Sequence, residues 1–313
     1  MLPSVVTHEL QDSVRKFLRA TFPMTAPLFR RAGGGTMLDE FLAEPGNLFK
    51  GPYVEIGLPF RRAGEGESVP FEHVGVPFTP FGHQMQAFRR LASPNPRSTL
   101  VATGTGSGKT ECFLLPILDH CARAKGSGIK ALIIYPMNAL ANDQARRFAA
   151  TIHSQTSLRG KVTVGLYVGQ RERSPHKAMT AEQVITSHET LRESPPDILL
   201  TNYKMLDFLL LRPRDQKLWR LNKPGMLRYL VVDELHAFDG AQGTDLACLV
   251  RRLRDRLGAG PELSCIGTSA TVGDGGAGQE LLDYAGKVFA TEFEPDSIIR
   301  EDRESAEEFL TGS

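Results

Sequence analysis

The sequence predicts an α/β fold in which a mostly parallel β-sheet is covered by helices on both faces. Short, continuous apolar runs alternate along the chain with longer segments in which apolar residues recur at helical spacing. Continuous apolar strands are typical of sheets buried on both faces, and strands that alternate with helices pair in parallel through right-handed crossovers. The predicted strands are residues 98–102, 131–135, 162–168, 198–201, 229–232 and 263–268. The predicted helices are residues 109–125, 139–152, 203–211 and 241–257.

Sequence pattern divides the chain into three parts. Residues 1–77 contain one segment of helical spacing, residues 8–20, which is followed by repeated prolines and glycines, and they predict an N-terminal accessory segment. Residues 78–290 carry the alternating strands and helices and predict the main domain. Residues 291–313 are acidic and polar with little apolar periodicity, which predicts a linker.

Composition narrows the class of protein. The 37 Lys and Arg residues nearly balance the 36 Asp and Glu residues, so the net charge of +1 indicates that any nucleic-acid surface is local. The four cysteines show no C-x-x-C spacing, which argues against a zinc site or a redox motif. The sequence shows no signal-peptide pattern and no apolar run that approaches about 18 residues, so we expect a cytoplasmic protein without a membrane partner.

A glycine-rich segment, residues 103–110, connects a predicted strand to a predicted helix. Its glycines allow backbone N–H groups to approach phosphates, and the helix N-terminus adds positive potential. Lys109 is expected to reach the β- and γ-phosphates of ATP, and the Thr110 hydroxyl is expected to ligate Mg²⁺. Thr103 stands where the strict phosphate-loop pattern has glycine. The expected ATP-binding residues of this segment are Thr103, Gly104, Thr105, Gly106, Ser107, Gly108, Lys109 and Thr110.

A second motif, Asp233-Glu234-Leu235-His236, directly follows a predicted strand. A carboxylate at a strand end beside the phosphate loop is needed to hold Mg²⁺, which is the role expected of Asp233. Glu234 is then placed to orient or deprotonate the attacking water. Two interpretations of His236 stay open, a direct catalytic role and a structural histidine that connects neighbouring loops.

A third motif, residues 267–271, ends the predicted strand 263–268 with small and hydroxyl-bearing residues. Hydroxyl groups at this strand end can form hydrogen bonds with the turn that follows Asp233. We therefore expect Ser269 and Thr271 to couple the state of the nucleotide to the rest of the protein.

The order TGSGKT, DELH and SAT resembles motifs I, II and III of superfamily 2 helicases of the DEAD/DEAH type. The resemblance covers residues 78–290 and implies a P-loop fold, the first of two RecA-like domains, which uses ATP and Mg²⁺. It further implies an adenine-recognising role for Gln84, with Phe78 or Phe81 packed on the base. The alternative for Gln84 is an ordinary residue at the start of a helix. The catalytic residues that the resemblance implies are Lys109, Asp233, Glu234 and His236.

Three further segments resemble the nucleic-acid-binding motifs of the same superfamily. Residues 136–140 resemble motif Ia, residues 167–169 resemble motif Ib, and residues 201–206 resemble the next strand-binding motif. Each lies where a strand ends and a helix begins, and helix N-termini bind backbone phosphates without reading bases. The alternative is that these residues only cap helices. The expected nucleic-acid-binding residues are Pro136, Asn138, Gly169, Arg171, Thr201 and Asn202.

The sequence around these motifs, at residues 201–207, 211–215 and 233–236, resembles the MrfA-like (YprA-like) branch of large bacterial DNA helicases. Members of that branch are tied to DNA repair or to phage defence. The resemblance implies ATP-driven movement along DNA, usually from 3′ to 5′, with a single strand or a duplex–single-strand junction as partner. Two alternatives stay open, an RNA helicase of the same superfamily and a nucleotide-gated nucleic-acid-binding module whose hydrolysis needs a partner domain.

Superfamily 2 motors close two RecA-like domains over ATP, and the second domain supplies arginines that stabilise the transition state. The Q-x-x-G-R-x-x-R segment that carries those arginines does not follow Thr271. We therefore expect a fragment, a split subunit or a piece of a longer protein, completed by a second RecA-like domain in cis or in a partner chain. The isolated chain is expected to hydrolyse ATP very slowly.

Overall fold

The computed structural model describes residues 3–44, 46–47, 57–64, 66–104, 106–169, 174–270 and 277–311. The chain forms two compact units, Met1–Leu58 and Pro59–Ser313. Within the described part of the chain, the structure contains no helix long and apolar enough to cross a membrane.

The smaller unit contains helix α1 (Pro3–Thr21), the 3₁₀ turn η1 (Pro27–Phe29) and helix α2 (Met37–Ala43). The α2 N-terminus is closed by a capping box, in which the Thr36 side chain and the Asp39 side chain each accept a hydrogen bond from the backbone of the other. Arg19 of α1 pairs with Asp39 at 2.6 Å, so side chains join the two helices of this unit. The exposed fraction of Leu42 is 3%, which makes it the buried centre of α2.

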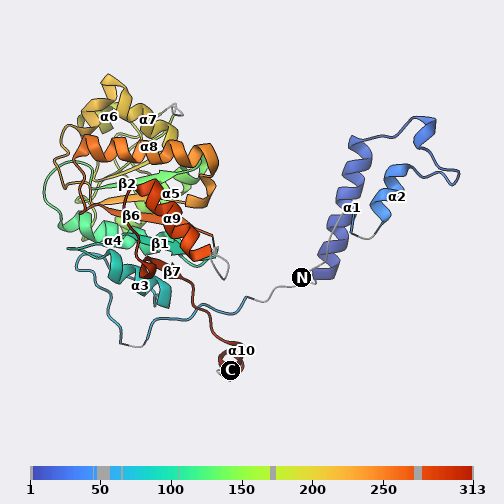
Figure 1. Cartoon of the computed structure of the whole chain (residues 1–313), viewed down its shortest axis with the longest axis horizontal. Coiled ribbons are helices and arrows are strands. Elements are labelled where there is room, and N and C mark those ends of the chain that lie inside the picture. Colours follow the sequence, from blue (N-terminus) through green and yellow to red (C-terminus); the bar gives the residue numbers. More distant parts are fainter. Residues whose placement is uncertain are drawn as a thin grey trace. The chain divides into compact units, whose positions relative to one another are not determined.

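The larger unit is built on a seven-stranded sheet with the strand order β3-β4-β2-β5-β6-β1-β7. Figure 1 labels β2, β6, β1 and β7 of this sheet. Every recorded pair in this sheet is parallel. The strands are β1 (Thr99–Ala102), β2 (Ala131–Tyr135), β3 (Val164–Tyr167), β4 (Ile198–Asn202), β5 (Tyr229–Val232), β6 (Ser264–Ser269) and β7 (Ile298–Arg300). Because all of them run in one direction, their carboxyl ends share one edge of the sheet, where the predicted motifs lie.

Helices cover both faces of the sheet, and each face has its own hydrophobic core. Successive residues of β2 alternate between the two cores, with Leu132 and Ile134 in one and Ile133 and Tyr135 in the other. The first core contains residues of α7 (Tyr203–Leu211), α8 (Gly240–Leu257) and α9 (Ala277–Phe289). The second contains residues of α3 (Gly82–Leu91), α4 (Lys109–Arg123) and α5 (Asn138–Ser154). The remaining elements are α6 (His188–Glu193), α10 (Ala306–Thr311), η2 (Pro213–Trp219), η3 (Leu235–Ala237) and η4 (Pro295–Ser297).

The structure differs from the sequence-based expectation at both ends of the main domain. Residues 298–300, expected in a linker, form strand β7, which pairs with β1. Residues 59–77, expected in the accessory segment, belong to the larger unit, where the Arg61 N–H donates to the carbonyl of Asp302 at 2.8 Å. These contacts join segments that lie far apart in the sequence, and a strand of three residues is too short to leave a periodic signal.

Candidate nucleotide site and nucleic-acid groove

The phosphate loop follows β1 and is held by its own side chains. The Thr103 and Ser107 hydroxyl oxygens lie 2.7 Å apart, and the Ser107 hydroxyl also donates to the Gly104 carbonyl at 2.8 Å. A hydroxyl at position 103 therefore ties the two ends of the loop together, which a glycine there could not do. Thr105 lies outside the described residues.

Gly108 begins helix α4 in the left-handed conformation, with φ of 77°. Glycine adopts this conformation without strain. A Cβ atom at this position would lie 2.3 Å from Gln84 Nε2, so a larger residue would also displace the end of the Gln84 side chain.

Sites for small ligands have volumes of about 300–1,000 Å³. A cavity of about 530 Å³ lies beside this loop. Gln84 and Phe81 line one part of it, and Lys109, Thr110 and Glu234 line another. The structure thus brings residues of three predicted motifs to one cavity. The complete lining is Arg62, Phe78, Thr79, Phe81, Gln84, Gly106, Gly108, Lys109, Thr110, Glu111, Arg147 and Glu234.

Gln84 is held by backbone groups on both sides. Its Oε1 accepts a hydrogen bond from the Phe81 N–H at 3.0 Å, which caps α3, and its Nε2 donates to the Gly108 carbonyl at 3.3 Å. Its exposed fraction is 3%. Gln84 therefore acts in helix capping, as the alternative interpretation expected, and it also borders the cavity expected to take the adenine.

Lys109 and Glu234 face one another across the cavity. The Lys109 Nζ lies 3.4 Å from Glu234 Oε1 and 3.4 Å from the carbonyl oxygen of Ser269. The phosphate loop, the turn after β5 and the end of β6 therefore meet at one ammonium group. A phosphate that entered the cavity would compete for that ammonium, so these contacts can respond to a nucleotide.

Thr268 connects the two carboxylates of the second motif. Its hydroxyl donates to Asp233 Oδ1, and its Oγ1 accepts the Glu234 N–H at 2.9 Å. Glu234 has φ of 50°, a left-handed conformation that costs a non-glycine residue free energy and occurs mainly at functional sites. The fully buried Thr268 thus stabilises a strained turn that directs Glu234 toward Lys109.

Asp233 is almost completely buried, with an exposed fraction of 7%. Burial raises the pKa of its carboxyl above the ordinary value, while the Thr268 hydrogen bond opposes this shift. A hard divalent cation stabilises a buried carboxylate that has no ion-pair partner among the described residues, because the carboxylate oxygens coordinate the cation. Asp233 and the Thr110 hydroxyl therefore fit the oxygen ligands that Mg²⁺ requires.

Replacing Asp233 with Asn should increase the stability of the nucleotide-free chain. The folded state binds the Asp233 proton more tightly than the unfolded chain, so the wild type loses stability as the pH rises above about 3.9. Asn removes this loss and can still accept the Thr268 hydrogen bond. We expect a gain of about 1 kcal/mol in unfolding free energy at neutral pH, read as a melting-temperature rise of about 2–4 °C.

Thermal melts without nucleotide and Mg²⁺, at acidic and neutral pH, measure this gain. It should shrink toward zero as the pH approaches the ordinary Asp value of about 3.9. A gain that is equal at both pH values, or no gain at all, would contradict the assigned effect of burial. Asp239→Asn is a matched control because Asp239, which precedes α8, is not buried.

His236 connects the second and third motifs. Its Nδ1 lies 3.3 Å from the Ser269 Oγ, 3.4 Å from the Ala270 N–H nitrogen and 3.4 Å from Glu234 Oε2. Its side chain is half exposed, so it also reaches the surface at the edge of the sheet. The predicted partner Thr271 lies outside the described residues.

A second cavity, of about 450 Å³, lies at the ends of β2, β3 and β4, and we call it the groove. It gathers four of the predicted nucleic-acid residues, Pro136, Asn138, Gly169 and Asn202. The Asn202 side chain accepts the Met205 N–H at 2.7 Å, which caps α7, and its Nδ2 donates to Asn138 Oδ1 at 2.5 Å. The other lining residues are Met137, Tyr203, Lys204, Met205, Phe208 and Gln242.

Two of the predicted nucleic-acid residues lie differently from the expectation. Thr201 is fully buried and its hydroxyl donates to the Tyr167 carbonyl at 2.7 Å, so its side chain is not available to a phosphate. Asn138 is not the N-cap of α5, because Met137 occupies that position and Asn138 is the first helical residue. Arg171 lies outside the described residues.

Sequence reasoning missed several groups at the nucleotide cavity. The expected contacts between hydroxyls of residues 267–271 and the turn after Asp233 are present, but Thr268, which was not singled out, makes the direct contacts with Asp233 and Glu234. Val232 pairs with Gly267, and this register makes Asp233 and Thr268 neighbours. Arg147 of α5 reaches the cavity and pairs with Glu111 at 2.8 Å. The Glu301 carboxylate, which follows β7, accepts the Gly104 N–H at 2.6 Å. No local pattern marks Arg147 or Glu301, because the fold alone brings them to the loop.

Comparison with known proteins agrees with this geometry. The family model described as DEAD/DEAH box helicase matches residues 81–276. The Druantia protein DruE of Escherichia coli is 27% identical over 363 aligned positions, which cover 85% of this chain and 20% of DruE. The uncharacterized ATP-dependent helicase YprA of Bacillus subtilis is 30% identical over 195 positions, which cover 61% of this chain and 23% of YprA. The chain thus spans about a fifth of the length of these curated relatives.

The fold also matches a solved structure. The crystal structure of the DUF1998 helicase MrfA bound to DNA and AMPPNP has a TM-score of 0.54 and a sequence identity of 21%, and the match covers 77% of this chain and 30% of that one. At this level of identity the match supports the RecA-like fold of the larger unit.

Proposed function

The chain belongs to the DEAD/DEAH box helicases, and on that premise we propose that it is the ATP-binding half of a motor that moves along a DNA strand. One observation carries the proposal. Lys109 of the phosphate loop contacts both Glu234 and the end of β6, at the same edge of the sheet as the groove that gathers Asn138 and Asn202. A nucleotide that changes the contacts of Lys109 can therefore affect the edge of the sheet at which the strand is proposed to bind.

We infer distinct roles for the residues around the nucleotide. The N–H groups of the phosphate loop and the Lys109 ammonium hold the phosphates, and Thr110 and Asp233 hold Mg²⁺, which neutralises charge on the phosphates. Glu234 orients the attacking water and accepts its proton, since phosphoryl transfer depends mainly on positioning and on charge stabilisation. Phe81 packs near the base, and Gln84 keeps α3 against the loop.

Coupling to the strand passes through His236. In the described structure its Nδ1 contacts both Glu234 and Ser269, so a change at Glu234 can reach the end of β6 through this nitrogen. This supports the structural interpretation of His236 over a direct chemical role. Its half-exposed ring is also placed to meet a second RecA-like domain, in cis or in a partner chain, which would supply the transition-state arginines.

The groove is proposed to hold the backbone of a DNA strand. The N-termini of α5 and α7 open into it, and helix N-termini bind phosphates without reading bases. MrfA, whose structure was solved with DNA, shares the fold. We propose movement from 3′ to 5′, which is what the resemblance of the sequence to the MrfA-like branch implies. A role in DNA repair or phage defence is part of the proposal, because the MrfA-like branch that the sequence resembles has members of both kinds.

Comparison of DNA and RNA strands tests this function. Backbone contacts alone do not identify the sugar, which a protein distinguishes through the 2′-hydroxyl. Hydrolysis of ATP that is stimulated by a single DNA strand supports the proposal. Stimulation by RNA of the same sequence would support the RNA-helicase alternative.

A further inference from the structure

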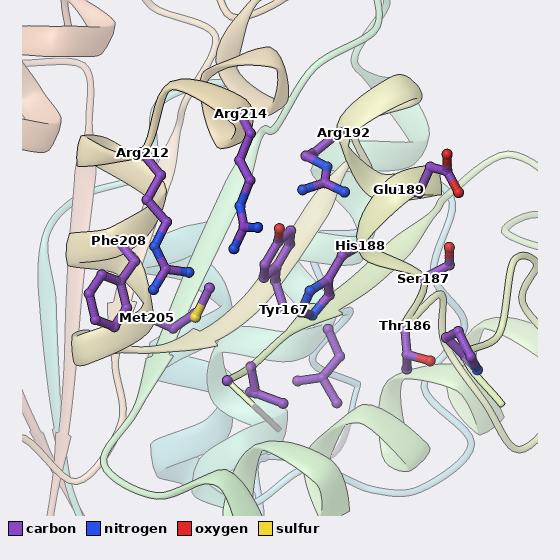
Figure 2. A pocket seen from close by; sticks show the side chains of 14 residues that line it. Tyr167, Thr186, Ser187, His188, Glu189, Arg192, Met205, Phe208, Arg212 and Arg214 are labelled. Carbon is purple, nitrogen blue, oxygen red and sulfur yellow. The ribbon is translucent and has the colours of Figure 1, made fainter. Parts of the chain in front are cut away.

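A third cavity, of about 420 Å³, lies beyond the end of β3, between α6 on one side and α7 with η2 on the other (Figure 2). Residues 167–169, Met205 and the segment 211–215 border it, but none of its charged side chains was assigned a role from the sequence. We call it the arginine pocket. Its lining is Leu166, Tyr167, Val168, Gly169, Pro175, Thr186, Ser187, His188, Glu189, Arg192, Met205, Phe208, Arg212 and Arg214.

Three arginines from separate elements converge on this pocket, and Figure 2 shows their side chains directed toward its interior. Arg192 of α6 lies 3.2 Å from one oxygen of Asp215, and Arg214 lies 3.8 Å from the other. These two guanidinium groups share the single carboxylate of Asp215, which is fully buried. The side chain of Glu189 lies at the opposite rim from Arg212 (Figure 2).

Arg212 lies over the Phe208 ring, with its guanidinium carbon 3.8 Å from the ring centroid. Among the residues that the structure describes, no carboxylate lies within ion-pair distance of Arg212. Stacking holds the guanidinium plane while leaving its N–H donors in the plane, where they can bind a phosphate. The three arginines of the pocket therefore outnumber its two carboxylates, Asp215 and Glu189.

The partly exposed His188 ring forms one wall of the pocket, and the almost fully buried Tyr167 ring supports it from behind. Tyr167 and His188 stack with their ring centroids 3.8 Å apart and an interplanar angle of 13°. The Tyr167 hydroxyl donates to Asp215 at 2.7 Å, so the same buried carboxylate fixes the ring and positions the arginines. Cations beside flat aromatic surfaces are typical of sites for single-stranded nucleic acid, where bases stack while phosphates pair with arginine.

The arginine pocket is continuous with the groove. Gly169, Met205 and Phe208 line both cavities. We propose that the arginine pocket receives one nucleotide of the strand that occupies the groove, with its phosphate on Arg212 and Arg214 and its base against the aromatic wall. The proposal rests on the proposed nucleic-acid function. It extends the strand path beyond the helix N-termini, past the edge strand β3.

Binding of a fluorescein-labelled oligothymidylate strand, followed by anisotropy from about 50 to 200 mM salt, tests this inference. The double variant Arg212→Gln/Arg214→Gln should bind about tenfold more weakly at the lower salt concentration. The slope of log affinity against log salt should fall by about 0.7 for each lost phosphate contact with a single strand. Arg212→Lys/Arg214→Lys keeps both charges and should retain most of the slope.

Arg256→Gln is the matched control, because this exposed arginine lies near the far end of α8, roughly 20 Å along the helix from Gln242 of the groove. It should leave affinity and slope unchanged. If the wild type binds the strand and the double glutamine variant, still folded by circular dichroism, binds it equally well, the arginine pocket is not part of the path. If the wild type binds no strand at all, the proposed function fails first, and the pocket's role fails with it.

Discussion

Glu234→Gln is expected to lower ATP turnover by about 10²–10⁴-fold in a motor that contains this chain and its second RecA-like domain. Gln keeps the size of the side chain and can still accept a hydrogen bond from Lys109, but it cannot take a proton from water. ATP affinity should stay within about threefold of the wild type, because the loop and Lys109 remain and the competing carboxylate charge is removed. Phosphate release measures turnover, and calorimetric titration measures affinity.

Glu111→Gln supplies the matched control for this substitution. Glu111 lines the same cavity but pairs with Arg147 at 2.8 Å and does not contact Lys109 in the described structure. Turnover of the control should remain within about tenfold of the wild type, which corresponds to a change of at most about 1.4 kcal/mol in the activation free energy. Wild-type turnover in Glu234→Gln would show that another group positions the water.

Lys109→Ala is expected to weaken ATP binding by about 10²–10⁴-fold. The ammonium makes charge-assisted hydrogen bonds to two phosphates, and each bond to a charged group contributes about 1.5–3 kcal/mol. Its side chain is 13% exposed, and the described lining of the cavity contains no second lysine. Titration of Mg²⁺–ATP into the isolated chain, followed by calorimetry, measures the loss.

Lys125→Ala controls for the loss of one positive charge. Lys125 is exposed and lies just beyond the last residue of α4, at the opposite end of that helix from the phosphate loop. Its removal should leave ATP affinity within about twofold, the size of a screened surface effect. ATP affinity in Lys109→Ala that equals this control would remove the basis for placing ATP in the cavity.

Local sequence patterns were sufficient to predict most of the sheet. The strands 131–135 and 229–232 have the predicted bounds, because each is an uninterrupted apolar run buried on both faces. Helix α7 also has its predicted bounds, since Asn202 caps it through its own side chain. These features depend on residues within one element, which is why the sequence alone identifies them.

Features that depend on contacts between distant segments were not predictable. Strand β7 depends on the edge of β1, and Glu301 reaches Gly104 only because β7 lies beside the phosphate loop. Thr201 has the residue type of a phosphate ligand, but its position in β4 directs the hydroxyl to the Tyr167 carbonyl of β3. The arginine pocket likewise joins α6 to η2 across a buried carboxylate, Asp215.

The rate of ATP hydrolysis, measured for this chain together with its second RecA-like domain, tests the central claim most directly. The rate is compared without nucleic acid, with a single DNA strand, and with an RNA strand of the same sequence. We expect DNA to raise the rate about tenfold or more, within the usual range of coupling between sites, and RNA to leave it near the basal value. Equal stimulation by RNA, or a rate of hydrolysis that neither strand changes, would contradict the account of a DNA motor.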